Sequence, residues 1–313
     1  MKEKNDNGNK TLHKNVSFES GHRACAGCPI SIIYNGVLNS TDYKIVASNA
    51  TGCAEVVSTI YPYSSWNIPW IHNTFENAAA TISGVEAAYQ SFKNQGKLDK
   101  DYKFVAFGGD GGTYDIGLQS LSGALERGHD FAYVCYDNGA YMNTGNQRSS
   151  ATPLGSETTT SPFGEKHPAK EQRRKDLAKI AEAHDIEYVA QASVSHIDDL
   201  KRKAKKAIEV DGPAVLVVLS PCPTMWKFSP EKTLDVAKMA VETNFWPIFE
   251  IEDGNMKINY KAKEKTPVTE FMKMQGRFRH SVENDSVVKK IQDDVDDTWK
   301  KLLKREEIDK KDE

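Results

Sequence analysis

Short apolar runs alternate with amphipathic stretches through most of the chain. The runs are rich in Val, aliphatic and aromatic residues, as strands buried on both faces of a sheet are; they are Lys44–Ser48, Lys103–Phe107, Phe131–Tyr136 and Ala214–Leu219. The segments around them have helical character and predict helices at Glu76–Phe92, Asp115–Arg127, Lys170–His184 and His196–Val210. Strands that alternate with helices predict an α/β fold, a parallel sheet with helices on both faces.

Two long segments break this alternation. Tyr61–Trp70 is dense in aromatic residues and prolines and cannot form a regular helix. Gly139–His167 is a loop of Thr, Ser, Gly and Pro, and a loop of this length inside a compact domain is usually functional or mobile. Beyond Gly254 the chain is strongly charged, with helical character in Ser286–Leu303. We therefore expect a flexible tail at 1–14, a main domain at 15–250 and a charged C-terminal extension at 251–313.

Composition narrows the class of protein. The 313 residues are 39% hydrophobic and 27% charged, which is typical of a globular chain and excludes a disordered or fibrous one. The net charge is -3, so the chain lacks the excess of basic residues that is typical of proteins that bind nucleic acid. No apolar run is long enough to span a bilayer, and the polar first 14 residues contain no apolar core of a secretory signal. The sequence predicts a cytoplasmic protein that binds neither nucleic acid nor membrane.

A glycine-rich turn with one carboxylate follows the second predicted strand. Its residues run Gly108-Gly109-Asp110-Gly111-Gly112, directly before a predicted helix. Glycines at the carboxyl end of a parallel strand allow close approach of the backbone, and the next helix N-terminus favours phosphate. The turn is neither a Walker A loop nor a dinucleotide-binding fingerprint. Asp110 would repel a phosphate unless a cation lay between them, and Mg²⁺ meets that need.

An asparagine at the end of the next strand extends this pattern. Between Gly111 and Asn138 lie 26 residues, enough for one helix and one strand. Asn138 therefore reaches the same edge of the sheet, where its amide oxygen and Asp110 could share one metal ion. Ordinary strand-to-helix turns are also rich in Gly, Asp and Asn. The residues alone leave open both a metal–diphosphate site and two structural turns.

Five cysteines form a second candidate site. Their odd number in a large chain without an export signal disfavours disulfides and favours metal binding or catalysis. Cys25 and Cys28 form a CxxC pair, whereas Cys53 and Cys222 are remote. Four thiolates suit a [4Fe–4S] cluster or a structural zinc, and the spacing leaves cluster, zinc and unligated thiols open. Cys135 lies within an apolar strand, where a cysteine is best interpreted as a small buried hydrophobic residue.

Longer stretches add a family resemblance. The spacing of Gly109-Asp110-Gly111 from Asn138 resembles the thiamine diphosphate signature. From Gly21 to Trp226 the chain resembles the β subunit of pyruvate:ferredoxin oxidoreductases, a resemblance carried by GHRACAGC, GCAEV, YPYSSWNIPWIHNTFENAAATISGVEAAY, GGDGGTYDIGLQSLSGALERGHD, YDNGAYMNTGNQ and PCPTMW. It implies a thiamine diphosphate-binding fold. The implied reaction is oxidative decarboxylation of pyruvate with CoA to acetyl-CoA and CO₂, with electrons passed to ferredoxin.

The resemblance also implies roles for individual residues. It implies that Mg²⁺ is held by Asp110, Asn138 and the Ala140 carbonyl, and that Asn143 faces the 2-oxoacid. The diphosphate would lie against Gly109, Asp110, Gly111 and Gly112, near Thr144. One [4Fe–4S] cluster would be ligated by Cys25, Cys28, Cys53 and Cys222. Pro29 departs from the glycine expected in this family, outside the ligand set.

The implied partners are an α subunit, ferredoxin-like γ and δ subunits, and ferredoxin itself. The Glu that activates the aminopyrimidine of the cofactor is expected on another subunit. Other readings stay open: a different 2-oxoacid or oxalate as substrate, a non-catalytic iron–sulfur or zinc protein for electron transfer or structure, and a non-redox thiamine enzyme such as a decarboxylase. The non-catalytic iron–sulfur or zinc protein would have no use for the Asp110–Asn138 spacing. The non-redox thiamine enzyme would lack the four cysteines.

Overall fold

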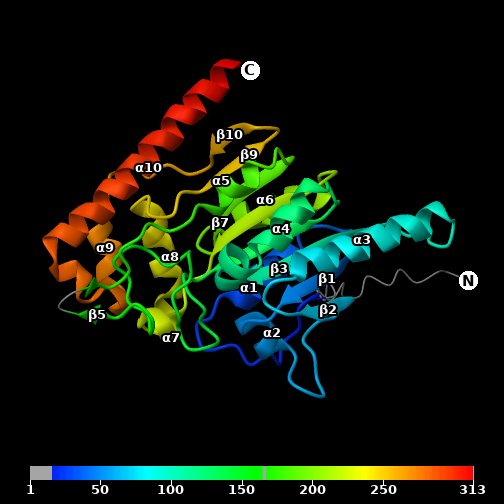
Figure 1. Cartoon of the computed structure of the whole chain (residues 1–313), viewed down its shortest axis with the longest axis horizontal. Helices are drawn as coiled ribbons and strands as arrows, with labels where there is room; N and C mark the ends of the chain where they lie inside the picture. The colour runs from blue at the N-terminus through cyan, green and yellow to red at the C-terminus, as the bar shows by residue number, and fades with distance from the viewer. Residues whose placement is uncertain (1–15, 165–166, 313) are drawn as a thin grey trace, which may run out of the picture.

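The computed structural model describes residues 16–164 and 167–312, so the tail expected at 1–14 lies outside the described residues. Its main feature is an eight-stranded sheet in the order β10–β9–β7–β8–β4–β3–β1–β2 (Figure 1). The strands are β1 (Lys44–Ala50), β2 (Trp70–Asn73), β3 (Tyr102–Gly109), β4 (Ala132–Asp137), β7 (Tyr188–Ser193), β8 (Ala214–Leu219), β9 (Phe249–Glu252) and β10 (Asn255–Ile258). A separate two-stranded ribbon pairs β5 (Phe163–Gly164) with β6 (His167–Pro168).

The predicted α/β class is confirmed, with a mixed sheet in place of a wholly parallel one. The strands from β7 through β2 pair in parallel. At the other end β9 runs antiparallel to β7, and β10 antiparallel to β9. The cause is the tight turn between β9 and β10, where Asp253 and Gly254 both have positive φ, 49° and 80°. Such a short turn can join only antiparallel strands.

Helices cover both faces of the sheet, as α1 packs on α6 and α3 packs on α4 (Figure 1). The α-helices are α1 (Ile30–Leu38), α2 (Cys53–Ser58), α3 (Ala78–Asn94), α4 (Leu118–Glu126), α5 (Leu177–Glu182), α6 (Ile197–Glu209), α7 (Pro223–Trp226), α8 (Thr233–Glu242), α9 (Val268–Lys273) and α10 (Asp285–Asp312). Shorter turns are η1 (Gly112–Ile116), η2 (Pro230–Lys232), η3 (Gly276–Phe278) and η4 (Ser281–Glu283). Among the described residues, no helix is both long and apolar enough to cross a membrane.

The five predicted helices are present with shifted ends. The largest difference at a helix start is in α5, which begins seven residues after Lys170, where the prediction began. Asp176 caps this helix, because its carboxylate accepts a hydrogen bond from the Lys179 amide at 3.2 Å. The residues before it are not helical. Among them, Lys170 donates to the Thr152 carbonyl in the loop after β4.

The C-terminal residues pack on the edge of the sheet that carries β9 and β10. In Figure 1 the long helix α10, drawn in red, lies at that end, and β1 and β2 lie at the other. The helix contacts β10 and buries Val287, Ile291, Val295 and Leu302. The helix predicted at Ser286–Leu303 is therefore confirmed and is longer. The proposed division at residue 250 stays a prediction.

The parallel strands end level with one another. Register pairs join Asn49 with Phe107 on β1 and β3, and Gly109 with Tyr136 on β3 and β4. A further pair joins Asp137 on β4 with Leu219 on β8. Because parallel strands release their carboxyl ends at one edge, this edge receives the residues that follow each strand, namely Cys53, Asp110, Asn138 and Cys222.

Candidate active site

Oxygen atoms converge where β3 and β4 end. The Asn138 amide N–H donates to Asp110 Oδ1 at 3.2 Å. The Asn138 carboxamide oxygen lies 2.9 Å from the same Oδ1 and 2.8 Å from the Ala140 carbonyl oxygen. In this orientation of the carboxamide three oxygens face one another without a proton between them; turned over, the carboxamide donates its N–H groups to the other two oxygens and satisfies both. Asp110, Asn138 and Ala140 thus bring together a carboxylate, an amide and a carbonyl oxygen, the ligand types that Mg²⁺ takes, and a bound cation would hold the carboxamide with its oxygen inward.

Asp110 is a buried carboxyl with one strong side-chain donor. It is 0% exposed, and the Ser149 hydroxyl donates to its Oδ2 at 2.5 Å. Burial raises the pKa of Asp110 well above its ordinary value, and the nearby Asp137 charge raises it further. A cation at the facing oxygens would favour the ionised carboxylate in this environment. The donor set fits the implied Mg²⁺.

The glycines after Asp110 stand where side chains would not fit. A Cβ atom at Gly111 would lie 2.5 Å from the Tyr141 ring, and one at Gly112 would lie 2.6 Å from the Phe75 carbonyl oxygen. The chain then forms η1, a single π-helical turn, before α4 begins. Turns of this kind occur often at functional sites. The backbone of this segment can therefore approach a ligand closely.

The loop that carries Asn138 and Ala140 is held by side chains from distant segments. Trp226 donates its indole N–H to the Asn138 carbonyl at 2.7 Å, and Thr152 donates its hydroxyl to the Gly139 carbonyl at 2.6 Å. Thr152 belongs to the long loop predicted at Gly139–His167, and its side chain is buried. That loop therefore supports the site as part of the packed interior.

A small cavity brings the predicted oxygen donors, glycines and one cysteine together. It encloses about 20 Å³, which is room for roughly one water molecule or ion. Tyr136, Gly52 and Phe75 are among its other lining residues. Cys53 lines this cavity. So does every residue predicted to contact thiamine diphosphate, Mg²⁺ or the substrate: Gly109, Asp110, Gly111, Gly112, Asn138, Ala140, Asn143 and Thr144. Asn143 and Thr144 are exposed at its mouth.

The four predicted ligand cysteines gather beside this cavity. All four are free thiols; Cys25 is exposed, and Cys28, Cys53 and Cys222 are partly buried. Burial is the main cause that raises the pKa of Cys28 to about 12, with smaller contributions from the Cys222 and Cys25 thiols. Burial likewise raises the pKa of Cys53 to about 12, with contributions from the other three. Because these thiols contribute to one another's pKa values, the four lie near one another.

Within residues 16–164 and 167–312, no group of three or more His, Cys, Asp or Glu side chains is arranged to hold a metal ion. Four thiols near one another are the donor set of a [4Fe–4S] cluster or of a structural zinc. Cys135 is fully buried within β4, which confirms its reading as a core residue.

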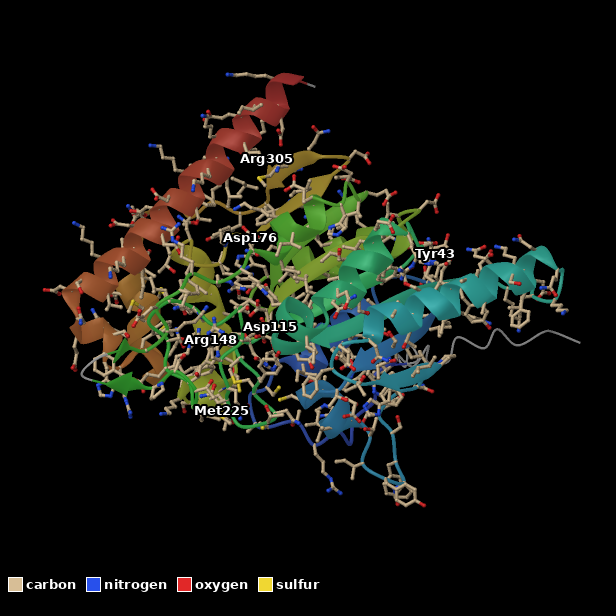
Figure 2. The ribbon with its side chains drawn as sticks, in the orientation of Figure 1. Tyr43, Asp115, Arg148, Asp176, Met225 and Arg305 are labelled. Atoms are coloured by element: carbon tan, nitrogen blue, oxygen red, sulfur yellow. The ribbon has the colours of Figure 1, made fainter. Side chains whose placement is uncertain are left out.

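Segments that follow different strands meet at this edge. Figure 2 shows Asp115, which comes after β3, beside Arg148, which lies in the loop after β4. Ser150, two residues after Arg148, joins the two segments, because its amide donates to Asp115 Oδ2 at 3.0 Å. Met225, on α7 after β8, lies below them in the same view.

Several residues of the site were missed in the sequence. Asp137 is buried, is paired with Arg174 and accepts a hydrogen bond from the Tyr114 hydroxyl at 2.7 Å. Its position next to Asn138 was the one available signal. Arg277 is also buried and stacks on Trp226, with its guanidinium carbon 3.5 Å from the ring centroid. It comes from the charged C-terminal part of the chain, where nothing in the pattern marks it.

Comparison with known protein families identifies the class of protein to which this fold and this site belong. Residues 50–218 match the family described as thiamine pyrophosphate enzyme, C-terminal TPP binding domain. This stretch includes the glycine–aspartate turn, Asn138, Asn143 and Cys53.

Similar proteins identify the family within this class. The chain is 50% identical to pyruvate synthase subunit PorB of Thermotoga maritima, over 95% of this chain and 94% of that one. It is 42% identical to ketoisovalerate oxidoreductase subunit VorB of Pyrococcus abyssi, over 95% of this chain and 96% of that one. A solved 2-oxoglutarate:ferredoxin oxidoreductase from Magnetococcus marinus shares the fold, with a TM-score of 0.56, 24% identity, and coverage of 66% of this chain and 67% of that one. The chain belongs to the family of β subunits of thiamine diphosphate-dependent 2-oxoacid:ferredoxin oxidoreductases.

Proposed function

We propose that the chain is the β subunit of a complex that converts pyruvate, CoA and oxidised ferredoxin to acetyl-CoA, CO₂ and reduced ferredoxin. The observation that carries the proposal is the single cavity lined by Asp110, Asn138 and Cys53. If Asp110 and Asn138 hold the cation of a diphosphate and Cys53 is a cluster ligand, the diphosphate and the electron acceptor would lie side by side. The 50% identity to a pyruvate synthase subunit over nearly the whole chain supports pyruvate as substrate.

Asp110, Asn138 and the Ala140 carbonyl would hold Mg²⁺, and the backbone of 109–112 would lie against the diphosphate. The facing oxygens and the excluded side chains at Gly111 and Gly112 support these roles. When bound, thiamine diphosphate supplies an electron sink for decarboxylation of a 2-oxoacid. Ser149 and Trp226 keep the oxygen donors in place through their hydrogen bonds to Asp110 and Asn138.

Asn143 and Thr144 stand at the mouth of the cavity, exposed and five and six residues beyond Asn138. We assign Asn143 to the substrate because its carboxamide can donate a hydrogen bond to a carboxylate or a keto oxygen. Thr144 would lie near the diphosphate. Its hydroxyl donates to Gln147 Oε1 at 2.5 Å, which holds this turn of the loop together.

Cys25, Cys28, Cys53 and Cys222 would ligate one [4Fe–4S] cluster. Such a cluster accepts one electron at a time, which suits an enzyme that delivers electrons to ferredoxin. Three backbone amides support the thiolate forms. A hydrogen bond from Ile30 acts to lower the pKa of Cys28, and hydrogen bonds from Met225 and Thr224 act to lower that of Cys222, against the larger effect of burial. Hydrogen bonds to the sulfurs are also one of the ways in which proteins set the potential of a cluster.

The remaining parts of the reaction require other chains. The enclosed floor of the cavity is ion-sized, so most of a thiamine diphosphate would lie outside it and contact an α subunit. We assign the activating Glu to that subunit, and the electron exit to ferredoxin-like γ and δ subunits and then to ferredoxin.

A substrate panel tests the proposal. The complex is purified without oxygen, and CoA-dependent reduction of ferredoxin is measured with pyruvate, 2-oxobutyrate, 2-oxoisovalerate, 2-oxoglutarate and oxalate. The expected result is the highest kcat/KM for pyruvate. A higher value for 2-oxoisovalerate would favour the activity named for the Pyrococcus abyssi relative. Absence of activity with every substrate, in a complex that retains thiamine diphosphate and iron, would overturn the proposal.

A further inference from the structure

One buried hydroxyl at the site has no acceptor for its proton among the described residues. Tyr136 is 1% exposed, on β4, two residues before Asn138. The backbone amide of Ala54 faces its oxygen and acts to lower its pKa, but no described residue accepts the hydroxyl proton. A buried hydroxyl whose proton has no acceptor is destabilising, so it calls for an acceptor that belongs to the loaded site.

The hydroxyl lies between the oxygen donors and the thiols. A Cβ atom at Gly52 would stand 2.8 Å from it, so the phenol abuts the backbone directly before Cys53. Tyr136 and Cys53 line the same cavity. A Cβ atom at Gly109, next to Asp110, would lie 3.2 Å from the same hydroxyl.

The Asp110 carboxylate is a less suitable acceptor for the Tyr136 hydroxyl than the Cys53 sulfur is. Asp110 already accepts hydrogen bonds from the Asn138 amide and the Ser149 hydroxyl, one on each carboxylate oxygen. Cys53, by contrast, would carry a negative charge once it is a cluster ligand. A thiolate is a good acceptor for a phenol that is already held in place by the packed core.

We propose that the Tyr136 hydroxyl donates a hydrogen bond to the ligated Cys53 sulfur and raises the reduction potential of the cluster. The inference rests on the proposed function, because it requires the cluster. Hydrogen bonds to the ligand sulfurs stabilise the more negative, reduced state and so raise the potential. Tyr136 acts as a positioning residue: it sets how readily the cluster accepts an electron.

The test is a redox titration of the anaerobically purified complex, followed by electron paramagnetic resonance. The cluster of this chain is recognised as the reduced-state signal that Cys222→Ala removes. Tyr136→Phe keeps the ring and removes only the hydroxyl. It is expected to lower the equilibrium constant for one-electron reduction of this cluster on the order of tenfold, which is about 59 mV toward negative potential. Iron content and thiamine diphosphate affinity should stay at the wild-type level.

Tyr133→Phe is the matched control. Tyr133 is a buried tyrosine on the same strand, and its hydroxyl already has a partner in Thr113 Oγ1 at 3.0 Å. Thr113 keeps its own bond to the Gly109 carbonyl at 2.8 Å, so the control leaves no orphaned group there. We expect no shift in potential from this variant.

Each outcome separates the inference from the proposed function. A cluster that is present in Tyr136→Phe with an unchanged potential overturns the inference alone. Weakened thiamine diphosphate binding without a shift in potential also overturns it, because the hydroxyl would then serve the diphosphate. A wild-type complex in which Cys222→Ala removes no iron–sulfur signal overturns the proposed cluster and the inference together.

Discussion

The two halves of the candidate site are built differently. The oxygen half, Asp110, Asn138 and Ala140, comes from the ends of two adjacent strands and is held by side-chain donors from Ser149, Trp226 and Thr152. The thiol half, Cys25, Cys28, Cys53 and Cys222, comes from three distant places in the chain that only the fold brings together. Burial raises the pKa values of Cys28 and Cys53 to about 12, so these thiols are protonated near neutral pH until iron displaces the protons.

This difference predicts how each half responds to damage. The oxygen donors are in place before a cation binds, so loss of one supporting contact should weaken binding by degrees. The thiols depend on the cluster itself for their ionised, ordered state, so loss of one ligand should remove the whole cluster. The predictions below test this contrast.

The largest effect is expected in the thiol half. Cys222→Ala should remove the iron and acid-labile sulfide attributable to this chain, and with it the CoA-dependent reduction of ferredoxin. Cys135→Ala is the control, because Cys135 is buried within β4 and not at a strand end; it should retain both elements. Measurement of iron and sulfide in the purified complexes decides between them. Equal losses in the two variants would indicate general misfolding and contradict the assignment of Cys222.

In the oxygen half, the largest effect is expected from Asp110→Ala. The variant lacks the one carboxylate among the three facing oxygens, so Mg²⁺-dependent thiamine diphosphate affinity should fall by at least about a hundredfold. Calorimetry on the complex measures it, and iron content should stay near the wild-type value. Wild-type cofactor affinity in this variant would show that the cation and the diphosphate bind elsewhere.

Asn143→Ala should affect turnover rather than cofactor content. The side chain stands exposed at the mouth of the cavity, so its loss should lower kcat/KM for the 2-oxoacid on the order of a hundredfold through lost positioning. Steady-state kinetics and bound thiamine diphosphate are measured on the same preparation. If the cofactor is lost as well, Asn143 belongs to the cofactor site instead.

The smallest effect is expected from Ser149→Ala, which removes the hydroxyl donor to Asp110. Affinity for thiamine diphosphate with Mg²⁺ should drop about tenfold, as expected for loss of a contact that orients a ligand. Ser150→Ala is the matched control, because the neighbouring hydroxyl donates to Asp115 instead. Equal effects in the two serine variants would argue that the loop, and not the contact with Asp110, determines affinity.

The two halves also differ in how far the sequence could predict them. The oxygen half was visible because Asp110 and Asn138 follow consecutive strands at a spacing of one helix and one strand. Cys25 and Cys28 form a recognisable CxxC pair, whereas the spacing left the role of Cys53 and Cys222 open and the family resemblance implied that they are cluster ligands. Ser149 lies in a Ser- and Thr-rich loop without a distinguishing pattern. Only the tertiary packing brings the Ser149 hydroxyl to Asp110.

The same holds for the fold. The four predicted strands were continuous apolar runs and are all present in the sheet. By contrast β7, with Ala, Gln and Ser among its residues, has a weak strand pattern and forms because it pairs with β8 and β9. The edge strand β2 is short and lies at the end of the aromatic segment that the pattern excluded from helix. The hairpin β9–β10 falls where the charge of the chain suggested only a surface extension.

The central claim is that one sheet edge holds a cation–diphosphate site and an iron–sulfur cluster side by side. The most direct test is a crystal structure of the anaerobically purified complex, with anomalous scattering measured at the iron and zinc edges. The account predicts iron density bounded by Cys25, Cys28, Cys53 and Cys222, and a diphosphate bridged by a cation to Asp110, Asn138 and the Ala140 carbonyl. Zinc density at the four cysteines, or a diphosphate bound away from Asp110, would contradict it.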